Sequence, residues 1–216
     1  MSSTPILFVD LNIQILEALK KEFHPLANID FSLNNIRDIT FHPGTMFMSP
    51  ANSIGFMDGG IDAAYMAMFP GVQKKVQDKI KQLGKQTSLG RYYLPIGSAV
   101  VVPVGYECTL VSAPTMFLPH NVSQTRNAYH AMMAALMAFK KQPNSQLLVA
   151  TGLCCGYGKM DPTVSAKQIL QAYDDCHNGR VPQEIEKLDD PSFLITPSRD
   201  DEQPRNFDNR EIHEIP

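Results

Sequence analysis

Residues 45–62, TMFMSPANSIGFMDGGID, indicate the fold more clearly than any other part of the chain. The stretch opens with a short apolar run, Thr45 to Met48, which is typical of a buried strand. It continues through Asn52 to the pair Gly59-Gly60, after which a helix is predicted to begin. Glycines between a buried strand and a helix leave backbone N–H groups bare at the helix N-terminus, where an anion binds favourably. The stretch therefore predicts an α/β domain with an anion-binding loop.

A second junction of the same kind lies at residues 147–160, LLVATGLCCGYGKM. Leu147 to Ala150 are predicted to form a buried strand, and a glycine-rich turn from Gly152 to Gly158 follows it. This turn is not a P-loop, because Leu153 and Met160 stand where that motif needs a glycine and a serine or threonine. Two glycine turns that each follow a buried strand predict a ligand site at one end of the sheet.

Strand-like and helix-like segments alternate along the rest of the chain. The other predicted strands are Ile6 to Val9, the segment around Phe31 and Leu33, Tyr92 to Val104, and Thr109 to Ala113. The predicted helices are 11–23 with Asp10 as N-cap, a helix from the glycines near 59 to Leu83 with a break at Pro70-Gly71, Asn121 to Lys141, and Thr163 to Cys176. The alternation predicts a layered α/β domain over residues 1–180. Prolines and acidic residues accumulate in residues 181–216, for which we expect a flexible or surface-draped tail.

Composition excludes several classes of protein. With 44% hydrophobic and 19% charged residues, the 216-residue chain fits a soluble globular domain. Its net charge of −3 argues against charge-driven binding to nucleic acid. No apolar stretch approaches the length that spans a bilayer, and no signal-like run opens the chain, so we expect no membrane partner and a cytoplasmic or nuclear location. The four cysteines lack a C-x-x-C spacing and are expected to be reduced thiols rather than metal ligands.

Three segments of the chain resemble signatures of the macrodomain family. Residues 49–62 resemble its Asn-Ala-Ala-Asn signature, which a glycine-rich loop and an aspartate follow. Residues 37–40, RDIT, resemble the Gly-Asp-Ile-Thr before that signature, and residues 154–158, CCGYG, resemble the later Ser-Thr-Gly-aromatic stretch. The segments occur in the family's order, and the similarity covers about residues 28–176. The resemblance implies a three-layer α/β/α sandwich with a mixed central sheet and an ADP-ribose cleft at one end.

The resemblance also implies roles for the matching residues. Asp38 would accept a hydrogen bond from the adenine amino group, with the backbone of Ile39 alongside, and Asn35-Ile36 is the alternative match if the following loop is longer. Asn52 and Asp62 would flank the ribose nearest the scissile bond. That ribose and the diphosphate would be held by Gly59, Gly60, Ile61, Cys155, Gly156, Tyr157 and Gly158. These residues require no metal and no cofactor.

The resemblance leaves the activity open, with ADP-ribose or an ADP-ribosylated protein as the expected partner. A hydrolase of ADP-ribosyl esters or related derivatives would use Asn52 to orient a ribose hydroxyl and Asp62 to accept a proton. A non-catalytic ADP-ribose reader would need the cleft alone, and a structural protein would keep only a degenerate pocket. The chain differs from the family at Pro50, Asp58 and Cys154-Cys155, and Met66 stands where some hydrolytic members carry a histidine. These differences indicate a divergent member.

Overall fold

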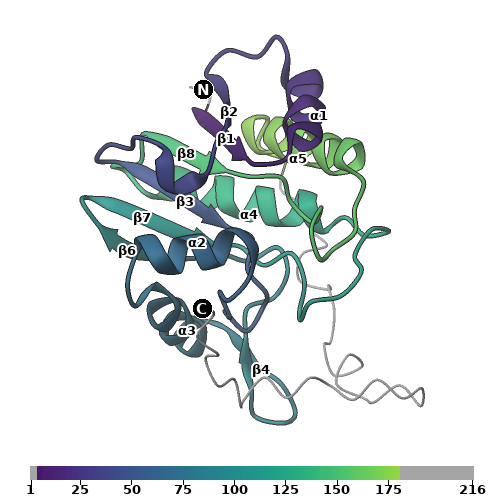
Figure 1. Cartoon of the computed structure of the whole chain (residues 1–216). Coiled ribbons are helices and arrows are strands. Elements are labelled where there is room, and N and C mark those ends of the chain that lie inside the picture. The colour runs from purple at the N-terminus through teal and green to yellow at the C-terminus, as the bar shows by residue number, and fades with distance from the viewer. Residues whose placement is uncertain (1–3, 181–216) are drawn as a thin grey trace, which may run out of the picture.

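The computed structural model describes residues 4–180 and is built on a six-stranded sheet in the order β2-β1-β8-β3-β7-β6 (Figure 1). The strands are β1 (Ile6–Asp10), β2 (Ile29–Leu33), β3 (Thr45–Ser49), β6 (Val100–Gly105), β7 (Cys108–Ser112) and β8 (Leu147–Ala150). Neighbours from β2 to β7 pair in parallel, whereas β6 pairs antiparallel with β7 at the edge. The predicted mixed sheet is therefore confirmed. Two short strands, β4 (Lys85–Gln86) and β5 (Tyr92–Tyr93), pair separately.

Helices cover both faces of the sheet and complete the predicted three-layer α/β/α sandwich (Figure 1). They are α1 (Ile13–Phe23), α2 (Gly60–Met68), α3 (Val72–Leu83), α4 (Asn127–Lys141) and α5 (Pro162–His177), with a 3-10 turn η1 (Ile36–Asp38). Helices α1, α4 and α5 pack in one apolar cluster, and α2 and α3 pack in the other. Pro70-Gly71 separates α2 from α3, as the sequence predicts.

The central strand β3 shows why these sequences form a buried sheet. Every residue of β3 is buried, and successive side chains enter opposite layers of the sandwich. Met46 and Met48 belong to the cluster under α1, α4 and α5, whereas Phe47 lies in the opposite cluster. The ring of Phe47 lies 5.8 Å from that of Tyr65 and 5.2 Å from that of Phe69, measured between centroids. Burial of each such side chain stabilises the fold by about 1.5–3 kcal/mol.

Two helix starts differ from the sequence prediction. Asn12 rather than Asp10 caps α1, because the Oδ1 atom of Asn12 accepts a 2.9 Å hydrogen bond from the N–H of Gln14. Helix α4 begins at Asn127 instead of residue 121. The intervening residues form turns, in which the N–H of Val122 donates to the carbonyl of Gly158 at 2.9 Å. This bond holds the segment before α4 against the second glycine loop.

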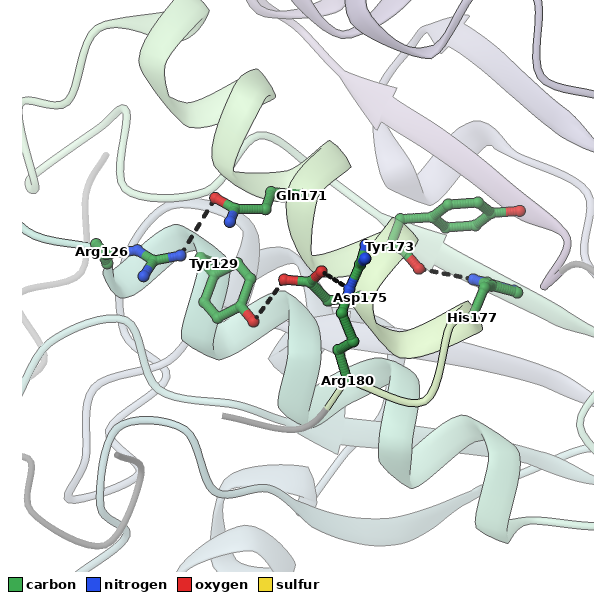
Figure 2. A network of polar contacts seen from close by, with 7 residues as sticks. All are labelled: Arg126, Tyr129, Gln171, Tyr173, Asp175, His177 and Arg180. Atoms are coloured by element: carbon green, nitrogen blue, oxygen red, sulfur yellow. Dashed lines mark hydrogen bonds and ion pairs between the residues drawn. The ribbon is translucent and has the colours of Figure 1, made fainter. Parts of the chain in front are cut away.

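A polar network fixes the end of α5 on α4 (Figure 2). The hydroxyl of Tyr129 donates to Oδ2 of Asp175 at 3.0 Å, and Nε of Arg180 donates to the other oxygen at 2.7 Å. The guanidinium of Arg126 stacks on the Tyr129 ring at 4.4 Å and donates to Oε1 of Gln171 at 3.2 Å. Because α5 follows the second glycine loop, these contacts also restrict where that loop can lie.

The predicted tail, residues 181–216, lies outside the described residues, so the proposed boundary near residue 180 stays a prediction. Among the helices of residues 4–180, none combines the length and the apolar character that a bilayer crossing requires.

Candidate functional site

A cleft of about 500 Å³ opens at the carboxyl ends of the central parallel strands. Both predicted glycine loops line it, together with the end of β1 and the segment after β2. Polar side chains and the two glycine loops form much of its wall, which includes Asp10, Asn34, Asn35, Arg37, Asn52, residues 58–62, Thr115, residues 151–152 and residues 154–158. Parallel strands bring their carboxyl ends to one edge of a sheet, which is where ligands of open α/β sheets bind. The cleft is the candidate functional site.

The first glycine loop places the N-terminus of α2 at the cleft. Gly59 is the N-cap of α2 and makes no side-chain cap hydrogen bond. The first N–H groups of a helix have no partner within the helix, so Gly60 and Ile61 present donors at this end. Gly60 has a φ of +56°, in the left-handed region that favours glycine, and no atom lies within 4 Å of the position that a Cβ would take. The loop is therefore open on the cleft side.

Two glycines of the second loop, Gly156 and Gly158, differ in their surroundings. Only at Gly158 would a side chain clash with neighbouring atoms. A Cβ on Gly158 would lie 2.5 Å from the carbonyl oxygen of Cys154 and 2.7 Å from a methyl group of Val122. A Cβ on Gly156 would meet no atom within 4 Å. Gly158 thus allows the loop to close on itself, whereas Gly156 leaves room for a ligand.

The two loops approach each other at Tyr157 and Gly59. A Cβ on Gly59 would lie 3.6 Å from the ring of Tyr157, which is 69% exposed. An exposed aromatic ring beside a bare backbone offers an apolar surface next to peptide N–H groups. Both features suit a ligand that combines sugar rings with phosphate groups.

Asp62 is a buried carboxyl group in the first turn of α2. It is 8% exposed, and its Oδ1 atom accepts a 2.6 Å hydrogen bond from the hydroxyl of Ser49. Burial raises the pKa of Asp62 to about 7, although the Ser49 hydrogen bond opposes this rise. A carboxyl group with this pKa exchanges a proton near neutral pH and can act as a general base.

The side chain of Asn52 lines the cleft and also braces the first glycine loop. Its Oδ1 atom accepts hydrogen bonds from the N–H groups of Ile54 and Phe56, at 3.1 and 3.2 Å. Its Nδ2 atom donates to the carbonyl of Phe56 at 3.0 Å. An amide nitrogen carries two hydrogens, so one remains for a ligand. That Asn52 orients a ribose hydroxyl stays a prediction. The structure shows, in addition, that its side chain holds the backbone of the first glycine loop in place.

The segment after β2 contributes to the cleft, but not through Asp38-Ile39, the pair that first matched the family motif. Asn35 and Ile36 line the cleft, whereas Asp38 and Ile39 are not among the lining residues. Asp38 is exposed at the end of η1. The alternative match, Asn35-Ile36, therefore lies at the cleft, and which of the two pairs would meet adenine stays a prediction.

Asp10, at the end of β1, is a cleft residue that the sequence prediction assigned to a helix cap. Its Oδ1 atom accepts a hydrogen bond from the N–H of Asn12 at 2.9 Å. Its Oδ2 atom accepts from the Thr151 hydroxyl at 2.6 Å and from the N–H of Gly152 at 3.2 Å. Asp10 thus connects β1 to the start of the second glycine loop. The one signal in the sequence is an aspartate directly after a buried strand.

Anion binding in this cleft would rest on backbone groups more than on cationic side chains. Arg37 is the one lysine or arginine among the lining residues, against Asp10, Asp58 and Asp62.

Burial raises the pKa of the Cys155 thiol, which keeps it protonated. Within residues 4–180, no group of three histidine, cysteine, aspartate or glutamate side chains could hold a metal ion.

No protein-family model matches the chain. Among solved structures, the macrodomain of Mycobacterium tuberculosis DarG superposes with a TM-score of 0.50 at 16% identity, over 60% of this chain and 81% of that one. The chain has a macrodomain fold. A protein of unknown function from Bacteroides thetaiotaomicron gives a TM-score of 0.48 at 10% identity, over 63% of this chain and 83% of that one. Thermosipho africanus DarTG in complex with ADP-ribose gives a TM-score of 0.47 at 15% identity. The superposition covers 77% of this chain and about half (49%) of that protein.

In this macrodomain fold, part of the cleft comes from outside the segment whose sequence resembles the family. That segment begins near residue 28, but β1 lies between β2 and β8 in the sheet. Asp10 and Leu11 therefore reach the cleft from the N-terminal unit of β1 and α1. Motif matching could not have found them.

Proposed function

We propose that the protein binds ADP-ribose, either free or attached to a protein, in the cleft between the two glycine loops. The observation that carries this proposal is the convergence of both loops on one cleft, with the start of α2 among its walls. The macrodomain fold and the resemblance of both loops to macrodomain signatures support the same ligand.

The chemistry of the cleft suits a diphosphate between two sugar rings. Bare N–H groups at the start of α2 and the dipole of that helix favour negative charge. Gly60 and Gly156 leave open space where phosphate oxygens can approach the backbone. A volume of about 500 Å³ is within the range of about 300–1,000 Å³ for small-molecule sites.

Calorimetric titration with ADP-ribose, AMP and NAD tests the ligand class. We expect ADP-ribose to bind most tightly, because AMP lacks the second phosphate and the distal ribose. In NAD, nicotinamide occupies the carbon that a free distal ribose would present to Asn52 and Asp62, so its affinity should also be lower. Equal affinity for AMP and ADP-ribose would show that the second half of the ligand makes no contact, contrary to the proposal.

A second candidate function is hydrolysis of an ADP-ribosyl ester or a related derivative, and the position and pKa of Asp62 favour it. Asp62 would take a proton from water as the water oxygen bonds to the ribose carbon and the ester carboxylate leaves with its electron pair. Asn52 would orient the ribose. Turnover of an ADP-ribosylated protein, compared between the wild type and Asp62→Asn, separates a hydrolase from a reader. A protein that binds ADP-ribose but turns over no ester, amide or phosphate-linked derivative is a reader.

A further inference from the structure

We propose a second binding site, at the opposite end of the sheet from the cleft, that takes a trimethylammonium group. The group is either free, as in choline, or carried by a trimethyllysine side chain. The site is a cavity of about 410 Å³ that is lined by Phe41, His42, Pro43, Tyr106 and Glu107. It shares no lining residue with the cleft, so a ligand can bind there whether or not ADP-ribose is bound.

The strand order places this cavity at the amino ends of the parallel strands, whereas the cleft lies at their carboxyl ends. Phe41 to Pro43 lead into β3, and Tyr106 and Glu107 form the turn between β6 and β7. Because β3 and β7 are parallel neighbours, the segments that precede them meet at one edge of the sheet. The N–H of Gly44 donates to the carbonyl of Glu107 at 3.0 Å and joins the two segments.

The side chains that line the cavity suit an organic cation. Phe41 and Tyr106 supply aromatic rings, and Glu107 supplies the one carboxylate. None of the five lining residues, all of which lie in the described part of the chain, is a lysine or arginine. A cation is attracted both to the face of an aromatic ring and to a carboxylate, and aromatic rings commonly recognise quaternary ammonium groups. The charge of Glu107 opposes an anionic ligand.

The backbone around the cavity favours a cation that carries no N–H groups. The carbonyl of His42 already accepts hydrogen bonds from the N–H and the hydroxyl of Thr45, at 3.1 and 2.7 Å. The thiol of Cys108 lies within donating distance of the carbonyls of His42 and Tyr106, at 3.4 and 3.3 Å. An unmethylated ammonium group brings three donors that need acceptors. A trimethylammonium group brings none, and its methyl groups can pack against the rings.

The two aromatic walls of the cavity differ in exposure. The ring of Phe41 makes T-shaped contacts with Phe47 and Phe69, at 5.2 and 6.4 Å between centroids, so the core holds it in place. Tyr106 is 83% exposed and forms the outer wall. A fixed inner ring and an exposed outer ring let a ligand enter from solvent and contact both.

The turn that carries the outer wall is strained. Tyr106 and Glu107 have φ angles of +51° and +54°, in the left-handed region. A two-residue hairpin turn with this backbone favours Asn-Gly, because other side chains are sterically disfavoured there. Strained backbone of this kind is concentrated at ligand sites. The sequence thus places a ring and a carboxylate at two positions whose backbone favours neither residue.

Choline and dimethylbutanol, its neutral analogue with carbon in place of nitrogen, test whether the cavity recognises the positive charge. The two molecules share a shape and differ in charge. In a titration followed by the NMR signals of residues 41–44 and 105–108, we expect the wild type to bind choline roughly 3- to 30-fold more tightly, the range for a cation–π contact. N-acetyl-trimethyllysine amide distinguishes the two sources. Tighter binding than choline indicates a methylated protein, and weaker binding indicates a free ligand.

Two variants test the aromatic ring and the carboxylate separately. Tyr106→Leu keeps apolar bulk but removes the ring, so the preference for choline over dimethylbutanol should largely disappear. Glu107→Gln should weaken choline binding and leave the affinity for dimethylbutanol unchanged. Tyr92→Leu is the matched control, because Tyr92 is an exposed tyrosine outside the cavity, and it should keep the wild-type preference. If Tyr106→Leu does not fold, Tyr106→Asn, which suits the turn, takes its place.

Replacement of both turn residues by Asn-Gly separates ligand recognition from folding. Tyr106→Asn combined with Glu107→Gly should unfold at a higher temperature than the wild type, because the strain is relieved, and should lose choline binding. Equal affinity of the wild type for choline and dimethylbutanol overturns the proposed site. Choline binding that survives in the double variant overturns it as well. Neither result bears on ADP-ribose binding in the cleft, which the calorimetric titration tests.

Discussion

The hydroxyl of Ser49, the last residue of β3, donates a 2.6 Å hydrogen bond to Oδ1 of Asp62 in the first turn of α2. Both side chains are buried, so the bond connects the two sides of the first glycine loop beneath the cleft. Burial raises the pKa of the Asp62 carboxyl to about 7, and the Ser49 hydroxyl lowers it. Asp62 therefore gains and loses its proton much closer to neutral pH than an exposed aspartate does.

The raised pKa makes the stability of the fold depend on pH. Because the folded state holds this proton more tightly than the unfolded state, the free energy of unfolding should fall as pH rises from about 4 to about 7. Asp62→Asn has no group that titrates there. We expect the stability of Asp62→Asn relative to the wild type to increase by about 2–3 kcal/mol between pH 5 and pH 8. Urea unfolding of both proteins at the two pH values measures this difference, and an unchanged difference would contradict the assigned burial.

The same pKa predicts the pH dependence of any hydrolysis. If Asp62 accepts the proton, turnover should rise with pH and level off above about 7, where the carboxylate is ionised. Asp62→Asn should lower turnover by about 10²–10⁴-fold. Ser49→Ala removes the hydrogen bond that lowers the pKa, so its midpoint should move to higher pH. A profile of turnover against pH for the three proteins tests this, and identical midpoints in the wild type and Ser49→Ala would speak against Asp62 as the base.

Asn52→Ala should reduce both the stability of the protein and its affinity for ADP-ribose. The side chain makes three hydrogen bonds to the backbone of Ile54 and Phe56, each of which contributes about 0.5–1.5 kcal/mol to folding. Loss of the brace also lets the first glycine loop move. Thermal unfolding and calorimetry measure the two effects. A loss of affinity with no loss of stability would mean that Asn52 acts on the ligand alone.

Gly158→Ala should destabilise the protein, whereas Gly156→Ala should not. The added methyl group at 158 overlaps the carbonyl of Cys154 and the side chain of Val122, and such overpacking costs about 1–3 kcal/mol. At 156 the methyl group meets open space. The two variants differ by two positions in one loop, so each is the control for the other. Equal unfolding temperatures of the two variants would contradict the close packing of Gly158 against Cys154 and Val122.

Much of the fold follows from local sequence signals. The apolar run at residues 147–150 and the break at Pro70-Gly71 were predictable because a buried parallel strand needs a continuous apolar stretch and proline interrupts a helix. The two glycine loops were predictable for the same reason, since each directly follows such a strand. Their convergence on one cleft follows from the parallel arrangement of the strands that precede them.

The contributions that the sequence did not reveal depend on contacts between distant residues. Asp10 accepts a hydrogen bond from Thr151, 141 positions away, and nothing local distinguishes it from a helix cap. The sequence left Asp38 and Asn35 open as matches to one motif position, and only the three-dimensional path through η1 places Asn35 at the cleft and Asp38 away from it. The start of α4 was predicted six residues too early, because the bond from Val122 to Gly158 holds the preceding segment in turns.

Calorimetry with ADP-ribose on the wild type, Gly156→Ala and Gly156→Glu tests the proposed cleft most directly. A Cβ at position 156 would meet no atom within 4 Å, so we expect both variants to fold, which circular dichroism checks. Gly156→Ala should bind ADP-ribose nearly as well as the wild type. Gly156→Glu should show no measurable binding, because it places bulk and a negative charge against the diphosphate. Unchanged affinity in a folded Gly156→Glu protein would contradict the assignment of the cleft as the ADP-ribose site.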